Sequence, residues 1–139
     1  MVITLSDEAR RILALFEDVT GAAGRDCLVE DDRVVVLVAT GDMGEAIGPG
    51  GQHVREFEKQ LGREAKLVED AATAEDFVAN ALAPAAVFNV TISENGDTVA
   101  YAEVAEEDTG VAIGTDGRNI ETARRLAARH FDVDDIQLT

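Results

Sequence analysis

Hydrophobic and polar positions alternate with two periods along the first half of the chain. Apolar residues recur at helical spacing from Ala9 to Val19, behind Ser6 as a typical N-cap, and a Val/Leu run at 34–38 is typical of a buried strand. Together these patterns predict six elements. They are a helix from Ser6 to Gly21, strands at 27–30 and 33–39, a short helical turn to Ile47, a helix ending at Gly62 and a strand at 65–69.

The second half repeats this order with clearer turn signals. Asn95-Gly96 between two alternating segments predicts a hairpin with a two-residue loop, and Pro84 cannot continue the helix that Thr73 begins. The predicted elements are a helix from Thr73 through Leu82, strands at 86–93 and 98–104, a helical turn at 106–112, a helix from Arg118 to about His130 and a strand at 133–138. Each half therefore reads α-β-β-α-α-β, which is an α+β fold.

A short motif is also repeated. The segment Ala46-Ile47-Gly48-Pro49-Gly50-Gly51-Gln52-His53-Val54 returns 66 positions later as Ala112-Ile113-Gly114-Thr115-Asp116-Gly117-Arg118-Asn119-Ile120. Both copies contain a G-x-x-G loop between two predicted helices. We therefore expect two domains, residues 1–70 and 71–139, with Ile47 and Ile113 buried at equivalent positions.

The charge composition narrows the class of protein. The chain has 28 acidic and 12 basic residues, a net charge of −16, and only two of the basic residues are lysines, Lys59 and Lys66. Such a chain repels nucleic acid at ordinary ionic strength, but the Debye length of about 3 Å in molar salt confines this repulsion to direct contacts. The composition favours a salt-loaded cytoplasm; an acidic protein with a basic partner is the alternative.

Other residue types limit the chemistry. Two histidines and the single Cys27 cannot form an internal disulfide or a sulfur and imidazole zinc site, so we expect no metal and no cofactor. Asp31-Asp32 and Asp134-Asp135 are interpreted as solvated charges. His130 has no evident acid and nucleophile around it, which disfavours an enzyme. The absence of a signal-like or membrane-spanning segment predicts a cytoplasmic protein without membrane contact.

The glycine loops are the candidate binding sites. A glycine loop that leads into a helix presents backbone N–H groups and the positive end of the helix dipole, which suits a phosphate. Both loops lie between helices, as in KH domains, which clamp about four nucleotides of single strand there. With I-G-x-x-G preceded by α-β-β, each half resembles the prokaryotic-type (type II) KH fold, and the tandem pair resembles the archaeal NusA-like transcription factors.

This resemblance implies a single-stranded RNA-binding factor in transcription elongation or termination, with RNA polymerase as a further candidate partner and a monomeric state. The implied RNA-binding residues are Ile47, Gly48, Pro49, Gly50, Gly51, Gln52, His53 and Arg55 in the first half, and Gly114, Thr115, Asp116, Gly117, Arg118 and Asn119 in the second. His53 and Asn119 could equally cap their own helices.

Two features depart from the resemblance and keep alternatives open. KH loops commonly carry a basic residue at a variable position, but Pro49-Gly50 has none and Asp116 is acidic. The four arginines after the second loop, at 118, 124, 125 and 129, either attract RNA or pair with surface carboxylates. The alternative functions are a protein-interaction adaptor that has lost RNA binding, docking on RNA polymerase or a ribosomal protein, and a ribosome-linked KH protein.

Overall fold

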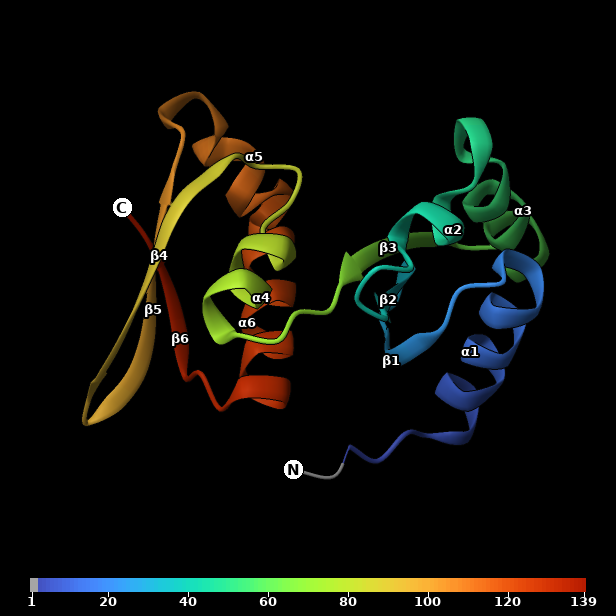
Figure 1. Ribbon diagram of the computed structural model, residues 1–139, viewed down its shortest axis with the longest axis horizontal. Coiled ribbons are helices and arrows are strands. Elements are labelled where there is room, and N and C mark those ends of the chain that lie inside the picture. Colours follow the sequence, from blue (N-terminus) through green and yellow to red (C-terminus); the bar gives the residue numbers. More distant parts are fainter. Residues whose placement is uncertain (1–2) are drawn as a thin grey trace. The chain divides into compact units, whose positions relative to one another are not determined.

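The computed structural model describes residues 3–139, which form two compact units (Figure 1). We call residues 3–70 the N-terminal unit and Ala71–Thr139 the C-terminal unit. Each contains a three-stranded sheet and helices in the order α-β-β-α-α-β. The predicted α+β fold is therefore confirmed in both halves.

The N-terminal unit places its helices on one face of the sheet. Its elements are α1 (Asp7–Thr20), β1 (Gly24–Val29), β2 (Arg33–Val38), α2 (Met43–Ile47), α3 (Gln52–Leu61) and β3 (Glu64–Glu69). Central β2 pairs antiparallel with β1 and parallel with β3. The core joins α1 to α3 through Phe16 and Phe57, whose rings meet edge to face at 5.2 Å.

The C-terminal unit has the same sheet order and connections. Its elements are α4 (Ala74–Ala81), β4 (Val87–Asn95), β5 (Asp97–Val104), α5 (Thr109–Ile113), α6 (Arg118–Phe131) and β6 (Asp135–Leu138). Central β5 pairs antiparallel with β4 and parallel with β6. Ala100 and Ala102 of β5 are fully buried, as are Ala123 and Ala127 of α6, so small side chains occupy buried positions in both the sheet and the helix.

The two units share an irregularity that the sequence pattern does not show. The first strand of each has a β-bulge, at Arg25 in β1 and at Phe88 in β4. The two bulge residues are separated by fewer positions in the sequence than the two glycine loops are. The helix after the loop is also longer in the second copy, because α6 has 14 residues and α3 has 10. The offset between the copies therefore changes along the chain, and the repeat is in strict register only around the loops.

Three predictions about local structure were wrong. Strand β1 begins at Gly24, not at Cys27, because Gly24 and Asp26 extend the ladder with β2 despite their turn-like composition. Asn95 lies opposite Asp97, so Gly96 alone turns the hairpin, with φ 88°, and the expected two-residue loop is absent there. Strand β6 begins at Asp135, and Val133 is buried before it.

The prediction that Ile47 and Ile113 are buried was also wrong. Their side chains are 41% and 40% exposed. Each ends a five-residue helix whose buried residue is the preceding alanine, Ala46 or Ala112. The two isoleucines are nonetheless equivalent, as expected, because both directly precede the first glycine of a loop.

A candidate nucleic-acid interface

The two glycine loops have the same backbone conformation. The first glycine, Gly48 or Gly114, has φ 73° or 79° and ψ 172° in both units. The third residue has φ 60° and ψ 18° at Gly50, and φ 55° and ψ 26° at Asp116. The N–H of the last glycine donates to the carbonyl of the first, at 3.0 and 3.1 Å. Two different sequences, Pro49-Gly50 and Thr115-Asp116, therefore form one loop geometry.

The first glycine of each loop is required by space as well as by φ. A Cβ on Gly48 would lie 2.5 Å from the His53 ring, and a Cβ on Gly114 would lie 2.8 Å from the backbone nitrogen of Asn119. A positive φ combined with ψ 172° is a backbone conformation essentially restricted to glycine. The loop thus folds tightly against the first turn of the following helix.

His53 and Asn119 hold the loops to the preceding short helices. His53 Nδ1 lies 2.7 Å from the carbonyl oxygen of Glu45 in α2. The Asn119 amide donates to the carbonyls of Val111 and Ala112 in α5, at 3.4 and 3.1 Å. Asn119 is 8% exposed. Neither side chain caps its own helix, α3 or α6, which was one of the two roles that the sequence left open; each instead contacts backbone carbonyls of the preceding short helix.

The helix N-termini at the loops differ from the other long helices. The N-termini of α1 and α4 are capped by the side chains of Ser6 and Thr73, and each has two acidic residues in its first turn. The N-caps of α3 and α6 are the glycines Gly51 and Gly117, which provide no side-chain cap. Since a helix N-terminus without such a cap favours an anion, these two termini suit a phosphate.

Two matched positions beside the loops differ in charge. In the N-terminal unit, Arg55 folds back so that its Nη1 lies 2.8 Å from the position of a Cβ on Gly51, and Gly50 contributes no side chain. The corresponding residues of the C-terminal unit are Glu121 and Asp116, both acidic. The N-terminal loop is therefore electrostatically better suited to a phosphate than the C-terminal loop.

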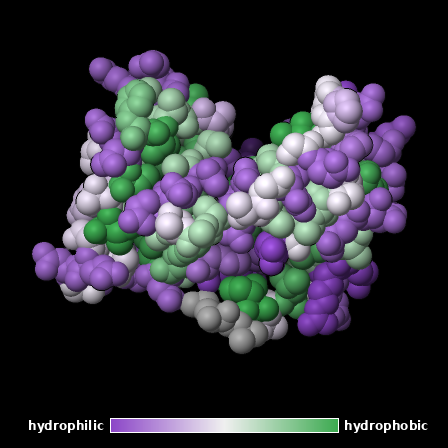
Figure 2. Space-filling view, in the orientation of Figure 1, coloured by the Kyte–Doolittle hydropathy of each residue, from purple (hydrophilic) through white to green (hydrophobic). Residues whose placement is uncertain are grey.

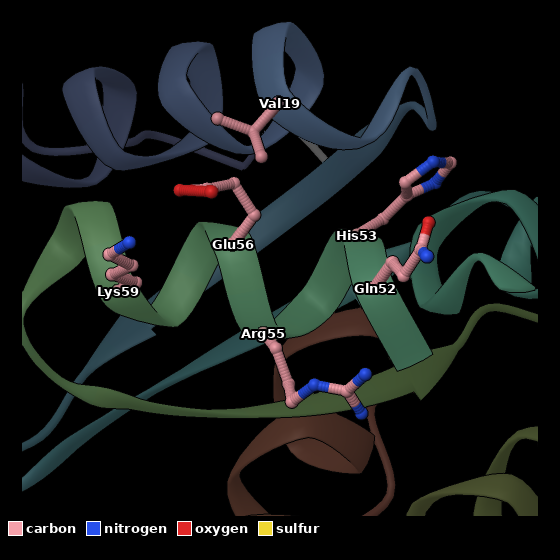
Figure 3. A pocket seen from close by; sticks show the side chains of 6 residues that line it. All are labelled: Val19, Gln52, His53, Arg55, Glu56 and Lys59. Carbon is pink, nitrogen blue, oxygen red and sulfur yellow. The ribbon is translucent and has the colours of Figure 1, made fainter. Parts of the chain in front are cut away.

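Grooves lie beside both loops. In the N-terminal unit a groove of about 460 Å³ runs between the end of α1 and α3 (Figure 3). Val19 and Glu56 point toward one another from the two helices. The residues that line it are Val19, Gln52, His53, Arg55, Glu56 and Lys59.

The groove of the C-terminal unit is lined by more apolar side chains than the groove of the N-terminal unit. It has a volume of about 490 Å³ and lies between the loop, α6 and the edge strand β6. Ile113, Ile120 and Leu138 line it, together with Gly117 and the polar side chains of Glu121, Arg124 and Gln137. An apolar groove next to a glycine loop provides a surface on which a nucleotide base can pack.

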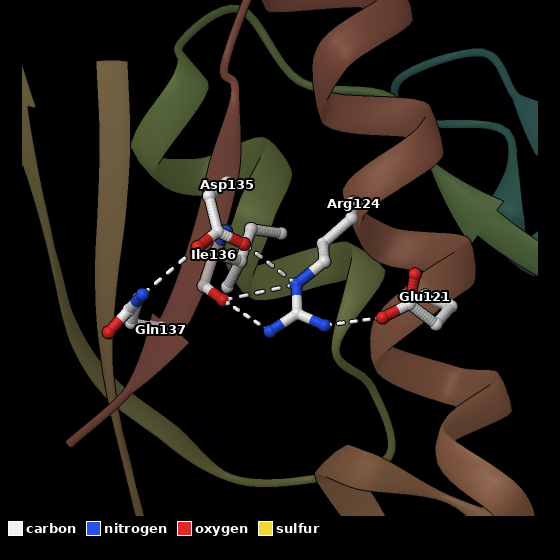
Figure 4. A network of polar contacts seen from close by, with 5 residues as sticks. All are labelled: Glu121, Arg124, Asp135, Ile136 and Gln137. Carbon is white, nitrogen blue, oxygen red and sulfur yellow. Dashed lines mark hydrogen bonds and ion pairs between the residues drawn. The ribbon is translucent and has the colours of Figure 1, made fainter. Parts of the chain in front are cut away.

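An arginine joins α6 to the edge strand at this groove (Figure 4). Arg124 donates through Nε and Nη2 to the carbonyl of Ile136, at 3.2 and 2.9 Å, and pairs with Asp135 and Glu121. A hydrogen bond from the Gln137 amide lowers the pKa of Asp135, as do the Ile136 N–H and the Arg124 charge, whereas burial opposes the shift. The carboxylate therefore remains charged and fixes Arg124.

The corresponding position in the N-terminal unit has the opposite polarity. Glu58 occupies in α3 the place that Arg124 has in α6, counted from the last glycine of each loop. Its carboxylate accepts a hydrogen bond of 2.8 Å from the backbone N–H of Ala65 in the edge strand β3. One helix position thus binds an edge-strand carbonyl in one unit and an edge-strand N–H in the other.

The structure brings the predicted residues together within each unit but gives them different positions. Pro49, Gly50, Thr115 and Asp116 are exposed at the loop tips, and Gln52 and Arg55 lie at the surface of α3. Arg118 is half-buried at the start of α6. The sequence did not predict that Arg124, Gln137 and Leu138 line the C-terminal groove. The feature of the sequence that could have indicated them is the β-α-α-β order of elements, because the last strand of such a unit pairs parallel with the first and lies beside the helix that follows the loop.

Asp42 and Asp108 are two further residues whose role the sequence did not predict, although they match between the copies. Each precedes a short helix, and its carboxylate accepts from a backbone N–H ahead of the first strand: Ala23 N at 3.0 Å and Ala86 N at 2.8 Å. These bonds tie the helix that leads into each glycine loop to the start of the hairpin.

Among residues 3–139, no helix is both long and apolar enough to cross a membrane. Within the same described range, no group of three or more His, Cys, Asp or Glu side chains is placed to hold a metal ion.

The fold and the paired loops define a tandem KH-domain protein. Residues 10–74 match the KH domain family, and residues 74–139 match the NusA-like second KH domain family. Probable transcription termination protein NusA of Halobacterium salinarum is 68% identical over the full length of both chains. The chain belongs to the NusA family of KH-domain proteins.

Further relatives extend this similarity. The protein of the same name from Halococcus morrhuae is 67% identical over 99% of each chain. That of Methanocaldococcus jannaschii is 28% identical, and the match covers 98% of this chain and 75% of the relative. The crystal structure of APE1850 has a TM-score of 0.82 at 29% identity, covering 97% of this chain and all of the other. The halophilic sources of the first two relatives agree with the expectation from composition.

Proposed function

We propose that this chain binds single-stranded RNA through its glycine loops and acts in transcription elongation or termination. The observation that carries the proposal is the repeated loop geometry, in which the same backbone angles precede two helix N-termini without side-chain caps. Its relatives are named as probable transcription termination proteins. The protein acts without catalysis, as a cytoplasmic monomer, and RNA polymerase is its candidate protein contact.

The N-terminal loop is the principal phosphate site in this proposal. Its backbone from Gly48 to Gly51 faces a phosphate without a side-chain charge, and Arg55 supplies the positive charge beside it. The C-terminal unit contributes the apolar groove of Ile113, Ile120 and Leu138, where bases pack. Asp116 makes its loop the weaker phosphate site, and Arg118 at the start of α6 partly offsets that charge.

The test is a single substitution, Gly50→Asp. The fold should tolerate it, because Asp116 already has the same conformation in the other loop, φ 55° against φ 60°. A carboxylate about 5 Å from a phosphate is repelled by about 0.8 kcal/mol at the dielectric constant of water and by about 3 kcal/mol at an effective value of 20. We therefore expect RNA affinity to fall about tenfold.

The assay is a binding isotherm by fluorescence anisotropy, with a labelled pool of random 12-nucleotide RNAs (a probe length of about three KH footprints). It is performed in molar KCl and at the lowest KCl concentration at which each variant stays folded. The matched control is Gly96→Asp, which adds the same charge at a positive φ with no atom within 4 Å, at the hairpin tip. Figure 1 shows that tip at the end of the C-terminal unit opposite α5.

Loop binding predicts that Gly50→Asp weakens the complex, that Gly96→Asp does not, and that the difference shrinks in molar KCl because of screening. Asp116→Lys should strengthen binding by the converse argument. Equal effects of Gly50→Asp and Gly96→Asp would show that only net charge matters. If neither Gly50→Asp nor Asp116→Lys changes the RNA affinity, the loops act only as turns, and the adaptor function is favoured.

A further inference from the structure

The edge strand β4 of the C-terminal unit is unusually unprotected. None of its nine residues is buried, and only Glu94 is charged, in a chain of which 29% of residues are charged. Edge strands present unpaired backbone groups and are normally shielded by charges, proline or burial. The bulge lies at the beginning of β4, so the ladder from Asn89 to Asn95 remains regular.

The equivalent strand of the N-terminal unit is different. Strand β1 has six residues, of which Asp26, Cys27 and Leu28 are buried, and its bulge residue is the charged Arg25. In β4 the bulge residue is Phe88, which is 70% exposed, more than any other large hydrophobic side chain among the described residues. The same backbone irregularity therefore presents a cation in one unit and an aromatic ring in the other.

Phe88 borders a small groove that has two acidic residues on its α4 side. This groove, of about 230 Å³, lies between α4 and β4 and is lined by Glu75, Asp76, Ala79, Val87, Phe88, Asn89 and Val90. Such a volume is below the range of small-molecule sites and fits a single long side chain. Figure 2 shows hydrophobic residues reaching the surface of the C-terminal unit on the side where Figure 1 places β4.

We propose that β4 and this groove form a docking surface for a basic, extended segment of a protein partner. The segment adds as a strand to β4, and one of its Arg or Lys side chains packs on the Phe88 ring and pairs with Glu75 or Asp76. Charge complementarity selects this occupant, because RNA or a second copy of this chain would bring negative charges against Glu75, Asp76 and Glu94.

This docking surface is separate from the groove of the C-terminal unit in which we propose that RNA bases pack. In the sheet order β4-β5-β6, β4 is one edge and β6, which lines the groove of Ile113 and Leu138, is the other. A protein partner and RNA therefore occupy opposite edges of the same sheet. This inference does not depend on RNA binding and would stand if the glycine loops bound none.

The experiment uses the complete chain, labelled with ¹⁵N, and a capped hexapeptide of alternating Arg and Val as the probe. Spectra are recorded in molar KCl, where the Debye length of about 3 Å suppresses attraction by distant carboxylates. Saturable shifts of amide signals are expected at Glu75, Asp76 and along β4. Phe88→Glu should weaken binding about tenfold, as expected for loss of an aromatic anchor.

The matched control is Arg25→Glu, which makes the bulge residue of the other unit acidic. If attraction to a carboxylate surface were the whole effect, both variants would bind the peptide more tightly. The docking surface predicts weaker binding by Phe88→Glu and unchanged binding by Arg25→Glu. Because Phe88 is largely exposed, its replacement should leave the melting temperature unchanged, and this is measured alongside.

Four results would overturn the proposal: Phe88→Glu binding as tightly as the unchanged protein, no saturable binding by the unchanged protein, shifts spread over both units, or competition between the peptide and RNA. A dimer of the unchanged chain in light scattering that Phe88→Glu abolishes would also overturn it, since a second copy would then be the occupant.

Discussion

Replacing the first glycine of the C-terminal loop, Gly114→Ala, should destabilise the protein more than any other single methyl group added to that loop. The conformation at φ 79° and ψ 172° costs a residue with a Cβ about 1–3 kcal/mol. The new Cβ would also lie 2.8 Å from the backbone nitrogen of Asn119, so the start of α6 must move. Forced repacking of this kind costs about 1–3 kcal/mol.

A combined loss of about 3 kcal/mol should lower the melting temperature by about 12–24 °C, since each kcal/mol shifts a domain of this size by about 4–8 °C. Gly117→Ala is the matched control in the same loop. Gly117 has φ 77° but no atom within 4 Å of its Cβ position, so only the left-handed backbone is penalised. That penalty of about 1 kcal/mol corresponds to about 4–8 °C.

The assay is thermal unfolding in molar KCl, followed by the fluorescence of Tyr101. The chain has one tyrosine and no tryptophan, so this signal reports on the C-terminal unit. Gly48→Ala, followed by far-ultraviolet circular dichroism, should have an intermediate effect because the His53 ring can rotate away, losing its bond to Glu45. Equal melting temperatures for Gly114→Ala and Gly117→Ala would refute the argument from close contact.

Two further predictions concern charge. Stability should rise with KCl concentration, because a net charge of −16 repels itself when unscreened; equal urea midpoints in dilute buffer and molar KCl would contradict this. The second prediction concerns the pH dependence of stability. Burial lowers the pKa of Lys66 to about 8 from its unfolded value of 10.5; the Arg33 charge lowers it further, and Glu30 opposes the shift. The unfolded chain therefore binds more protons above pH 8, so stability should rise from there towards pH 10.5. Burial raises the pKa of Cys27 from 9.0 to about 12, with Asp26 and Glu8 contributing. The folded chain therefore binds more protons at Cys27 above pH 9, so this group lowers the stability as pH rises and opposes the effect of Lys66 there. The Lys66→Met variant should lose the rise between pH 8 and 9 in urea titrations; the same rise in that variant would assign it to another group.

The sequence predicted those elements whose cause is local. Helix α1 has a hydroxyl cap at Ser6, apolar residues at helical spacing and a terminal Gly21, and each feature has its expected role in the structure. The glycine loops were found for the same reason, since their conformation depends on a few neighbouring residues. Strand β1 was predicted to begin too late, because the pairing of Gly24 with Val38 is a long-range contact that composition does not reveal.

The candidate site was predicted only in part for a similar reason. The loop residues and Arg55 follow one another in sequence, whereas the wall of the C-terminal groove comes from Leu138 in β6. Likewise, the pairing of Arg124 with Ile136 depends on where α6 ends and which edge of the sheet β6 joins. Buried Asn119 was included among the RNA-binding residues because a polar side chain beside a loop looks the same in sequence whether it points outwards or inwards.

The two copies separate what the loop needs for its shape from what it needs for a ligand. The glycines at 48 and 114, the aspartates at 42 and 108 and the alanines at 46 and 112 are the same in both, and each has a geometric role in backbone angle, hydrogen bonding or burial. Other positions differ between the copies and change the charge beside the loop, such as Gly50 against Asp116 and Arg55 against Glu121. The backbone angles of the two loops nevertheless differ by less than the ordinary scatter of φ and ψ within a helix or strand. Loop conformation in this protein is therefore independent of loop charge. We therefore expect that charge substitutions alone, without a structural change, decide which of the two loops binds a phosphate more tightly.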